Sequence, residues 1–318
     1  MSGEDRAASR GVEIRTISRQ EAGQRVDNYL LKALKGVPRS RIYRSVRRGE
    51  VRVNGGRISA DYRLQPGDQL RLPPVRVSSS KPLSSRQAGA PRLENDILYE
   101  DDRVLVLNKP SGMAVHGGSG VSFGVIETLR LERPAAPYLE LVHRLDRETS
   151  GCLLIAKRRS ELRLLHELLR GGRVEKRYLA LVRGRWTKGQ LAVDFALRKN
   201  RLRGGERMVR VDPNGKPSFS RFSPVWAENS ASLMEVELGS GRTHQIRVHA
   251  AELGYPLAGD PKYGDPDYNR EMRDIGLKRL FLHASSVAYT NPATGKCVHV
   301  SAPLADDLRI VLEALGHA

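Results

Sequence analysis

Residues 77–92 constrain the fold of this 318-residue chain most, because they offer a hydrophobic core almost nothing to bury. After Pro73 and Pro74 the chain is rich in Ser, Pro, Gly and Ala, which is the composition of a flexible linker. A chain of this length has room for about two domains. We therefore predict a tail over residues 1–12, a small domain over 13–76, a linker over 77–92 and a large domain over 93–318.

Basic residues are concentrated in the small domain. The chain carries 54 Lys and Arg against 36 Asp and Glu, a formal charge of +18, and residues 1–90 hold +11 of it. Between Lys32 and Arg57 there are nine basic residues and one acidic residue. Such a run is commonly a solvated helix face, but repulsion between cations of one sign is relieved by a polyanion, which favours nucleic-acid binding. The candidate binding residues are Arg39, Arg41, Arg44, Arg47, Arg48 and Arg52.

The small domain is predicted to contain two helices and a small hairpin. Apolar residues recur at helical spacing from Val26 to Ala33, Gly36 ends that helix, and a second helix covers 40–48. Short strands at 51–53, near Ile58 and at 70–72 are joined by turns at 54–55 and 66–68. This layout resembles the alpha-L RNA-binding module of a small-subunit ribosomal protein, some aminoacyl-tRNA synthetases and several RNA-modifying enzymes. The resemblance is carried by residues 25–27, Arg41, 49–55 and 67–68.

The large domain mixes short apolar strands with helical patterns. Strands are predicted at 97–99, 104–107, 151–157, 178–182, 233–238 and 287–289. A helix capped by Ser160 and ended by Gly171 buries a leucine-rich face, and another helix covers 243–253. Strands do not alternate regularly with helices, which disfavours a doubly wound parallel sheet and indicates an α+β domain.

Several classes of protein are not expected from this sequence. Cys152 and Cys297 lie far apart and outside any metal-ligand spacing, so neither a disulfide framework nor a metal site is predicted. The apolar runs are far shorter than the ~20 residues that span a bilayer, and no signal peptide is apparent. No P-loop or dinucleotide fingerprint occurs, so no nucleotide cofactor is expected. We expect a cytoplasmic protein without membrane contact and, in the absence of a heptad pattern or large apolar stripe, a monomer.

Two polar clusters adjoin predicted strands. Residues 108–118 form a Gly-rich loop of the kind found in ordinary wide turns. In residues 143–151, seven of nine residues are polar or charged, and Asp146 lies between Arg144 and Arg147. A carboxylate held ionised by such neighbours suits a nucleophile or base, and it equally suits a structural ion pair, which composition alone favours.

A third polar cluster, residues 239–247, joins a strand to a helix. Backbone amides and Arg242 at the helix start predict an anion site, for a phosphate or for a carboxylate elsewhere in the fold. His244 and His249 could be metal ligands, but no acidic or Cys partner has suitable spacing, so packing or hydrogen bonding is favoured. Tyr178 shares its strand face with Ala180 and Val182 and is by default a core aromatic residue.

Taken together, these clusters resemble the pseudouridine synthases that carry a His-Arg-Leu-Asp motif and modify ribosomal and transfer RNA. Residues 141–156 and 176–184 resemble most closely the branch that acts on three uridines of 23S ribosomal RNA. One departure is Ser240, where Thr is commoner in the family. The matching blocks follow the family's order over about residues 93–300, and they are 109–116, 143–151, 176–178, 241–247, 259–264 and 282–284.

The resemblance implies a fold, a reaction and roles for single residues. The catalytic domain would have a mixed, largely antiparallel sheet with flanking helices, and the reaction would need no cofactor or metal. Asp146 would be the nucleophile or base, and Arg242 would pair with it and keep it ionised. Tyr178 would stack beneath the uracil and assist proton removal from the ring. Arg144 would fill the gap left when the target nucleotide leaves its stack.

Sequence alone leaves the competing functions open. A non-catalytic RNA-binding or ribosome-assembly factor would explain the charge, and so would a synthase for other large-subunit uridines. A base-excising glycosidase would share the cleavage step. Whether Asp146 attacks the base, attacks the sugar or deprotonates the sugar is also undecided.

Overall fold

The computed structural model describes residues 12–317, except 20, 35, 36, 38, 75–91, 118–122, 202–206 and 229 and the side chains of 39, 40, 200, 201 and 207. The chain divides into two compact units, Met1–Ala88 and Gly89–Ala318. The boundary between them falls in the segment predicted as a linker. That segment, the predicted tail and the helix stop at Gly36 lie almost entirely outside the described residues. No helix among the described residues is long and apolar enough to cross a membrane.

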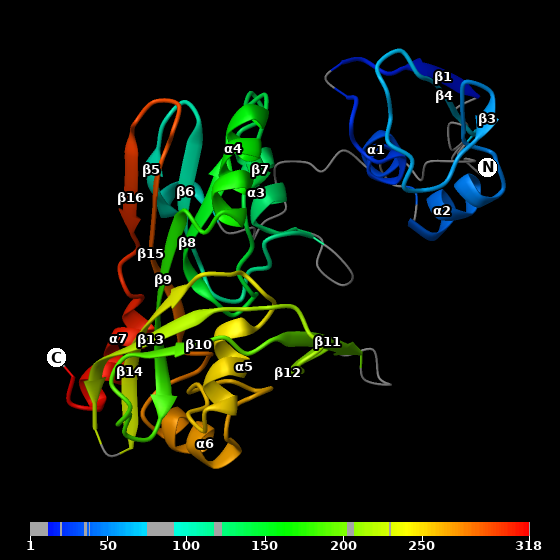
Figure 1. The fold of residues 1–318 in the computed structure, drawn as a ribbon. Helices are drawn as coiled ribbons and strands as arrows, with labels where there is room; N and C mark the ends of the chain where they lie inside the picture. The colour runs from blue at the N-terminus through cyan, green and yellow to red at the C-terminus, as the bar shows by residue number, and fades with distance from the viewer. Residues whose placement is uncertain are drawn as a thin grey trace, which may run out of the picture. The chain divides into compact units, whose positions relative to one another are not determined.

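The first unit packs two helices against a four-stranded antiparallel sheet with the order β1-β4-β2-β3 (Figure 1). Both predicted helices and the hairpin are confirmed, whereas the edge strand β1 was not predicted. Asn54 and Gly55 both have positive φ, as a tight two-residue hairpin turn requires. The elements are β1 (Glu13–Thr16), α1 (Val26–Ala33), α2 (Arg39–Arg47), β2 (Arg52–Val53), β3 (Gly56–Arg57) and β4 (Gln69–Leu72).

The second unit is built on a ten-stranded sheet, with a separate two-stranded hairpin, β11–β12. Its helices are α3 (Val125–Glu132), α4 (Arg159–Arg170), α5 (Gln245–Glu252), α6 (Pro266–Asp274) and α7 (Asp306–Ala314), with a short 3-10 helix at Glu94–Asp96. Its strands are β5 (Ile97–Glu100), β6 (Val104–Lys109), β7 (Glu140–Leu141), β8 (Ser150–Ala156), β9 (Val174–Arg183), β10 (Leu191–Val193), β11 (Leu197–Arg201), β12 (Arg207–Val211), β13 (Ser220–Ala227), β14 (Ala231–Leu238), β15 (Leu282–Thr290) and β16 (Cys297–Ser301).

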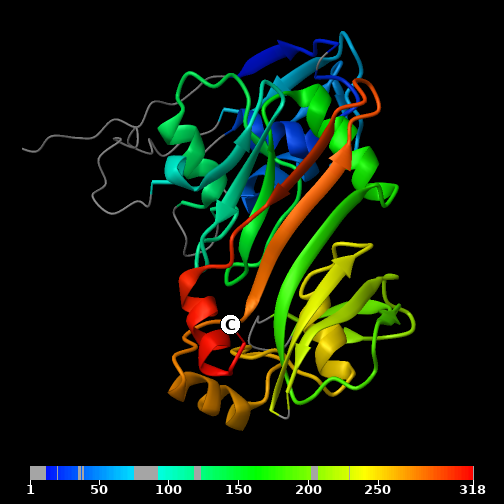
Figure 2. The same ribbon diagram turned by 90° about the vertical axis from the view of Figure 1, so that its left-hand side faces the viewer.

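The main path of the large sheet runs β10-β13-β14-β9-β15-β8-β6-β5, with β16 and β7 attached to β15 and β8. Among the described strands only β8 and β15 pair in parallel, which confirms the predicted mixed, largely antiparallel α+β fold. The long strands β9 and β15 run between two ends of the unit, one carrying α3 and α4 and the other α5, α6 and α7 (Figure 2).

Burial explains where the strands form and where the predictions missed. Every residue of β8 is buried, and at Gly151 a Cβ atom would lie 2.2 Å from the carbonyl oxygen of Ala284, so only glycine fits there. Strand β9 starts four residues earlier than predicted, because alternate residues from Val174 onward, including Lys176, face the interior. Helix α4 starts at Arg159 without a side-chain cap, so the predicted capping role of Ser160 is wrong.

Candidate active site

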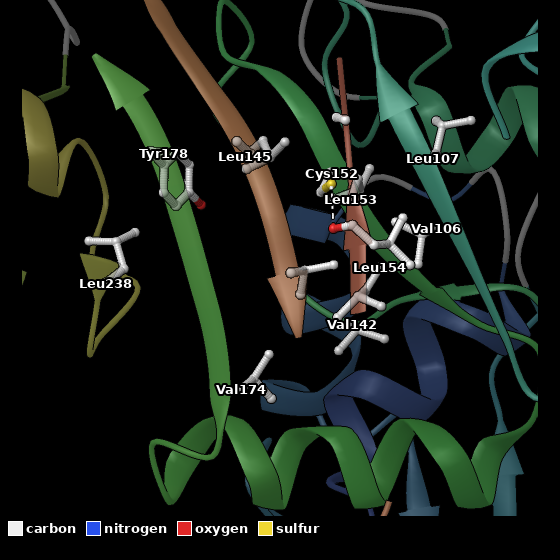
Figure 3. Packing of buried hydrophobic residues seen from close by; sticks show 14 of the residues in the cluster. Val106, Leu107, Val142, Leu145, Cys152, Leu153, Leu154, Val174, Tyr178 and Leu238 are labelled. Carbon is white, nitrogen blue, oxygen red and sulfur yellow. Dashed lines mark hydrogen bonds between the residues drawn. The ribbon is translucent and has the colours of Figure 1, made fainter. Parts of the chain in front are cut away.

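The second and third polar clusters and strand β9 meet at one cavity of about 450 Å³. The loop 143–149 before β8 forms one wall, and the segment 238–247 between β14 and α5 forms another. Tyr178 of β9 lines the cavity together with Leu145 and Leu238, and Figure 3 shows its ring between those two leucines. Segments that are about 100 residues apart in the chain therefore contribute to a single site.

Asp146 lies in the wall of this cavity, with its side chain 20% exposed. The backbone around it is fixed by a short turn, in which the Thr149 amide donates to the Asp146 carbonyl oxygen at 3.2 Å. A carboxylate in this position can meet a ligand in the cavity. The sequence neighbour Arg147 was expected to hold the Asp146 carboxylate ionised. In the structure Arg147 forms its ion pair with Glu148 instead.

The Gly-rich loop 108–117 contacts the loop that carries Asp146. The buried ammonium of Lys109 donates to the carbonyl oxygens of Pro110, Met113 and Arg147 at 2.7, 2.9 and 3.1 Å. The Gly112 amide also donates to the Arg147 carbonyl oxygen, at 2.9 Å. The first polar cluster is therefore a brace that positions the residue following Asp146, and this role was not visible in the sequence.

Arg247, and not the predicted Arg242, is the arginine beside Asp146. Its Nη1 lies 3.6 Å from Asp146 Oδ2, while Nε and Nη2 donate to the two carboxylate oxygens of Asp260 at 2.7 and 2.6 Å. The Arg247 side chain is 6% exposed and that of Asp260 is fully buried. Burial lowers the pKa of Arg247, but the bonds to Asp260 and the charge of Asp146 outweigh it and raise the pKa, so the guanidinium stays charged.

Arg242 occupies the rim of the cavity and is exposed. Its Nε donates to the carbonyl oxygen of Pro217 at 3.1 Å, and its backbone amide donates to Gln245 Oε1 at 3.0 Å. Among the ion pairs of the described residues, none joins Arg242 to Asp146. The predicted pairing of Arg242 with Asp146 is therefore wrong. The reason is geometric, because Arg242 precedes α5 whereas Arg247 lies within the first turn of that helix.

His244 links Asp146 to a tyrosine that the sequence did not single out. The residue has φ 54° at the start of α5, and its Nε2 lies 3.8 Å from Asp146 Oδ2. Its Nδ1 lies 2.8 Å from the Tyr263 hydroxyl, which accepts from the Val209 amide at 2.9 Å. Burial lowers the pKa of His244, so the ring is neutral near pH 7. The Tyr263 hydroxyl can then donate its hydrogen bond to the unprotonated Nδ1. In that tautomer the ring proton is on Nε2, which faces Asp146.

Tyr178 and His143 complete the inner wall. Burial, and after it the charge of Asp146, raises the pKa of the Tyr178 phenol above its usual range, so the hydroxyl stays protonated. Burial, and after it the charge of Lys176, lowers the pKa of His143 to about 4, so the imidazole stays neutral. His143 Nε2 accepts from the Leu154 amide at 3.2 Å and ties the Asp146 loop to β8.

Arg144 lies at the cavity wall with an exposed side chain, and this side chain has no hydrogen-bond or ion-pair partner in the part of the chain that the structure describes. His249 does not face the cavity. Its Nε2 lies 2.9 Å from Ser218 Oγ and 3.2 Å from the Phe195 carbonyl oxygen, in keeping with the predicted hydrogen-bonding role. Within the described ranges no group of three or more His, Cys, Asp or Glu is arranged to hold a metal ion.

The arginines predicted to bind nucleic acid lie in and after α2 of the first unit. Arg44, Arg47 and Arg48 are exposed. Arg41 is 3.7 Å from Glu50, and Arg52 donates to the Gly49 carbonyl oxygen at 3.1 Å. The side chain of Arg39 lies outside the described residues.

Comparison with known proteins finds a matching family for each of the two units. Residues 103–252 match a family described as RNA pseudouridylate synthase, and residues 24–70 match the S4 domain. The chain is similar to "Ribosomal large subunit pseudouridine synthase C" of Pasteurella multocida (strain Pm70), with 54% identity over 314 residues that cover 98% of this chain and 96% of that protein. It is 52% identical over 311 residues to the protein of the same name from Escherichia coli (strain K12), covering 96% and 98%.

Two solved structures are similar in fold over about two thirds of the chain. "Human RNA Pseudouridylate Synthase Domain Containing 4" aligns with a TM-score of 0.59 and 24% identity, covering 70% of this chain and 94% of that one. "Human RNA Pseudouridylate Synthase Domain Containing 1" aligns with a TM-score of 0.54 and 26% identity, covering 67% and 85%.

Proposed function

The chain belongs to the RNA pseudouridylate synthase family, and from that premise we propose that it isomerises specific uridines of 23S ribosomal RNA with Asp146 as the reacting carboxylate. The enzyme is an isomerase. The bond between the sugar and N1 of uracil breaks, the base turns, and C5 is joined to the same sugar carbon. A proton leaves C5 and one is gained at N1, so the atoms balance and nothing is oxidised or reduced.

The observation that carries the assignment is the position of Asp146 in the cavity wall, next to Tyr178 and 3.6 Å from Arg247. The nucleophile or base must be ionised, because a protonated carboxyl group can neither attack nor accept a proton. Arg247 places a cation 3.6 Å from Asp146 Oδ2, where it can orient the carboxylate. Asp260 holds that guanidinium in place, since its two oxygens bind two of the three guanidinium nitrogens.

Tyr178 and Arg144 are assigned to the substrate. The Tyr178 ring lines the cavity and can stack on a uracil. As a neutral phenol, Tyr178 can take part in removing the C5 proton only if its own proton passes to a base, and Asp146 is the nearby carboxylate. A target base within a stack must be flipped out before it reaches the cavity. The exposed side chain of Arg144 can then enter the RNA helix and fill the gap that the base leaves.

The substrate follows from the relatives and from the first unit. Both named relatives act on the ribosomal large subunit by their names, and the S4 unit presents exposed arginines on α2. We assign these arginines to the phosphates of the same RNA, which positions the molecule without reading its sequence. Both named relatives are bacterial proteins, and bacteria assemble ribosomes in the cytoplasm, so we infer that this chain works there.

The test is release of tritium from RNA labelled at C5 of uracil. Large-subunit RNA should lose tritium and gain pseudouridine with the full-length protein, and Asp146→Asn should lower the rate by at least about 10³-fold. Asp102→Asn is the matched control, because Asp102 is an exposed carboxylate paired with Arg158 outside the cavity. RNA binding without tritium release would support the assembly factor instead, and free uracil would support a glycosidase.

A further inference from the structure

Lys176 is a buried lysine with no role in the mechanism above. It lies on β9 two residues before Tyr178, so both side chains are on the same face of the strand, and both line the cavity. The residue is 8% exposed. On the neighbouring strand β15, it stands opposite Val287, an apolar residue.

No protein group compensates the charge of Lys176. Within the residues that the structure describes, its ammonium makes no hydrogen bond and no ion pair. Lys109 is the internal comparison, because it is buried as well but donates to three carbonyl oxygens. A buried cation without an acceptor is costly, and such groups are usually paired or hydrogen-bonded. The open side of Lys176 is the cavity, so its acceptor is expected to come from a ligand.

The cavity around Lys176 has an excess of positive charge. Arg144 and Arg170 line it, and both are exposed and lack an acceptor among the described side chains and carbonyl groups. Asp146 is the carboxylate in the cavity lining. The charge on Arg247 is largely compensated by Asp260, which is not part of that lining. An anionic ligand is therefore favoured next to Lys176.

We propose that Lys176, with Arg170 at the rim, forms a phosphate-binding subsite for the nucleotide whose base stacks on Tyr178. The proposal rests on the proposed function, since it assumes that this cavity receives a flipped nucleotide. Residues two apart on a strand are separated by about 7 Å. A base on Tyr178 therefore has its own backbone within reach of Lys176. The subsite holds the nucleotide by its backbone while the glycosidic bond is broken and the base turns.

The first test compares Lys176→Met with Lys176→Arg in the full-length protein. Met has a similar length and removes a buried charge, so the fold should be retained. KM for large-subunit RNA should rise at least about 10-fold, with a smaller effect on kcat, and the salt slope of binding should fall by about 0.7. Arg should restore most of the affinity. Lys278→Met, at an exposed lysine outside the cavity lining, is the matched control.

The identity of the acceptor is tested on the RNA. The phosphates on either side of a mapped target uridine are replaced, one at a time, by neutral methylphosphonate. At the correct position the replacement should weaken binding of the wild-type protein and have little further effect on Lys176→Met. Equal losses in both proteins at each position would overturn the proposal. So would a Lys176→Met protein that binds native RNA like Lys278→Met.

A pH series adds a readout that a purely structural role would not change. Burial lowers the pKa of Lys176 to about 8, and a bound phosphate favours the charged form. Wild-type affinity should therefore fall as the pH rises through about 8, whereas Lys176→Arg should stay level, because arginine remains charged. The other titratable or charged groups of the lining are the same in both proteins, and they are His143, Arg144, Asp146, Arg170, Tyr178, Arg242, His244 and Arg247.

The two proposals fail in different ways. If the wild-type protein releases no tritium from any large-subunit RNA, the proposed function is wrong. If it does release tritium and the affinity of Lys176→Arg falls with pH as steeply as that of the wild type, only the phosphate subsite is wrong.

Discussion

The candidate active-site cavity and the α2 face of the S4 unit are both rich in arginine, but the arginines of the two regions differ in burial and in partners. Arg247 is 6% exposed, bound through two nitrogens to the buried Asp260 and directed at Asp146. Arg44, Arg47 and Arg48 on and after α2 are exposed, and their side chains have no hydrogen-bond or ion-pair partner in the described part of the chain. The buried arginine acts through its geometry, so its replacement should be severe. The exposed ones act through their summed field, so each should be replaceable.

The largest effect is expected for Arg247→Met. The change leaves the fully buried Asp260 carboxylate without its ion pair, which should cost about 3–5 kcal/mol of unfolding free energy. Activity should fall by at least about 10²-fold, because Asp146 loses the charge beside it. Chemical denaturation and tritium release measure the two losses.

Two variants separate these losses from each other. In Arg247→Met combined with Asp260→Asn, both charges of this buried ion pair are removed, so stability should recover while activity does not. Arg242→Met should cost less than about 0.5 kcal/mol, because that residue is exposed at the rim. If Arg242→Met destabilised the protein as much as Arg247→Met, the contrast between buried and exposed arginines would be wrong.

A second prediction concerns the exposed side of the comparison. Changing Arg44, Arg47 and Arg48 together to Glu should weaken RNA binding roughly 10- to 100-fold and flatten its dependence on salt. Each single change should have a small effect. The unfolding free energy should change little, since these side chains have no partner in the described structure. Filter binding over a range of salt concentrations measures the slope.

The matched control reverses the same number of charges elsewhere. Arg270, Arg273 and Arg309 are exposed on α6 and α7 of the large unit, outside the cavity lining. Their change to Glu should leave the RNA affinity closer to that of the wild type. Equal losses in both triple variants would mean that only net charge matters, and that α2 is no specific binding face.

The same contrast explains what could be predicted from the sequence. Regular patterns gave the fold class, because strands such as β8 are continuous apolar runs and the helices of the S4 unit repeat every three to four residues. Strand β9 was placed too short, because a buried lysine at its start breaks the pattern that marks an interior strand. Asp146, Tyr178 and Arg144 do line one cavity, as expected from residues in one set of motifs.

The partner of Asp146 could not be predicted from order along the chain. Arg242 and Arg247 occur in the same motif, and only the start of α5 at Gln245, after the left-handed His244, determines which one reaches the carboxylate. The buried partner Asp260 lies 13 residues after Arg247, and nothing in the residues around it indicates this pairing. One signal was available in the sequence, because Arg247 stands between Ile246 and Val248, and an arginine that is buried with such neighbours needs an acceptor.

The smallest predicted effect tests how far the geometric control extends from Asp146. In Tyr263→Phe, His244 Nδ1 loses its hydrogen-bond partner and the Val209 amide loses its acceptor. The unfolding free energy should fall by about 1–2 kcal/mol. The reaction should slow by roughly 10-fold, because the imidazole is no longer held with Nε2–H towards Asp146. RNA affinity should be unchanged if Tyr263 acts through His244 alone.

His244→Gln should slow the reaction to a similar extent, and Tyr263→Phe should add little to it, because both changes interrupt one chain of contacts. Additive losses in the double variant would show that Tyr263 and His244 act separately, and would limit the geometric control of Asp146 to Arg247 and Asp260.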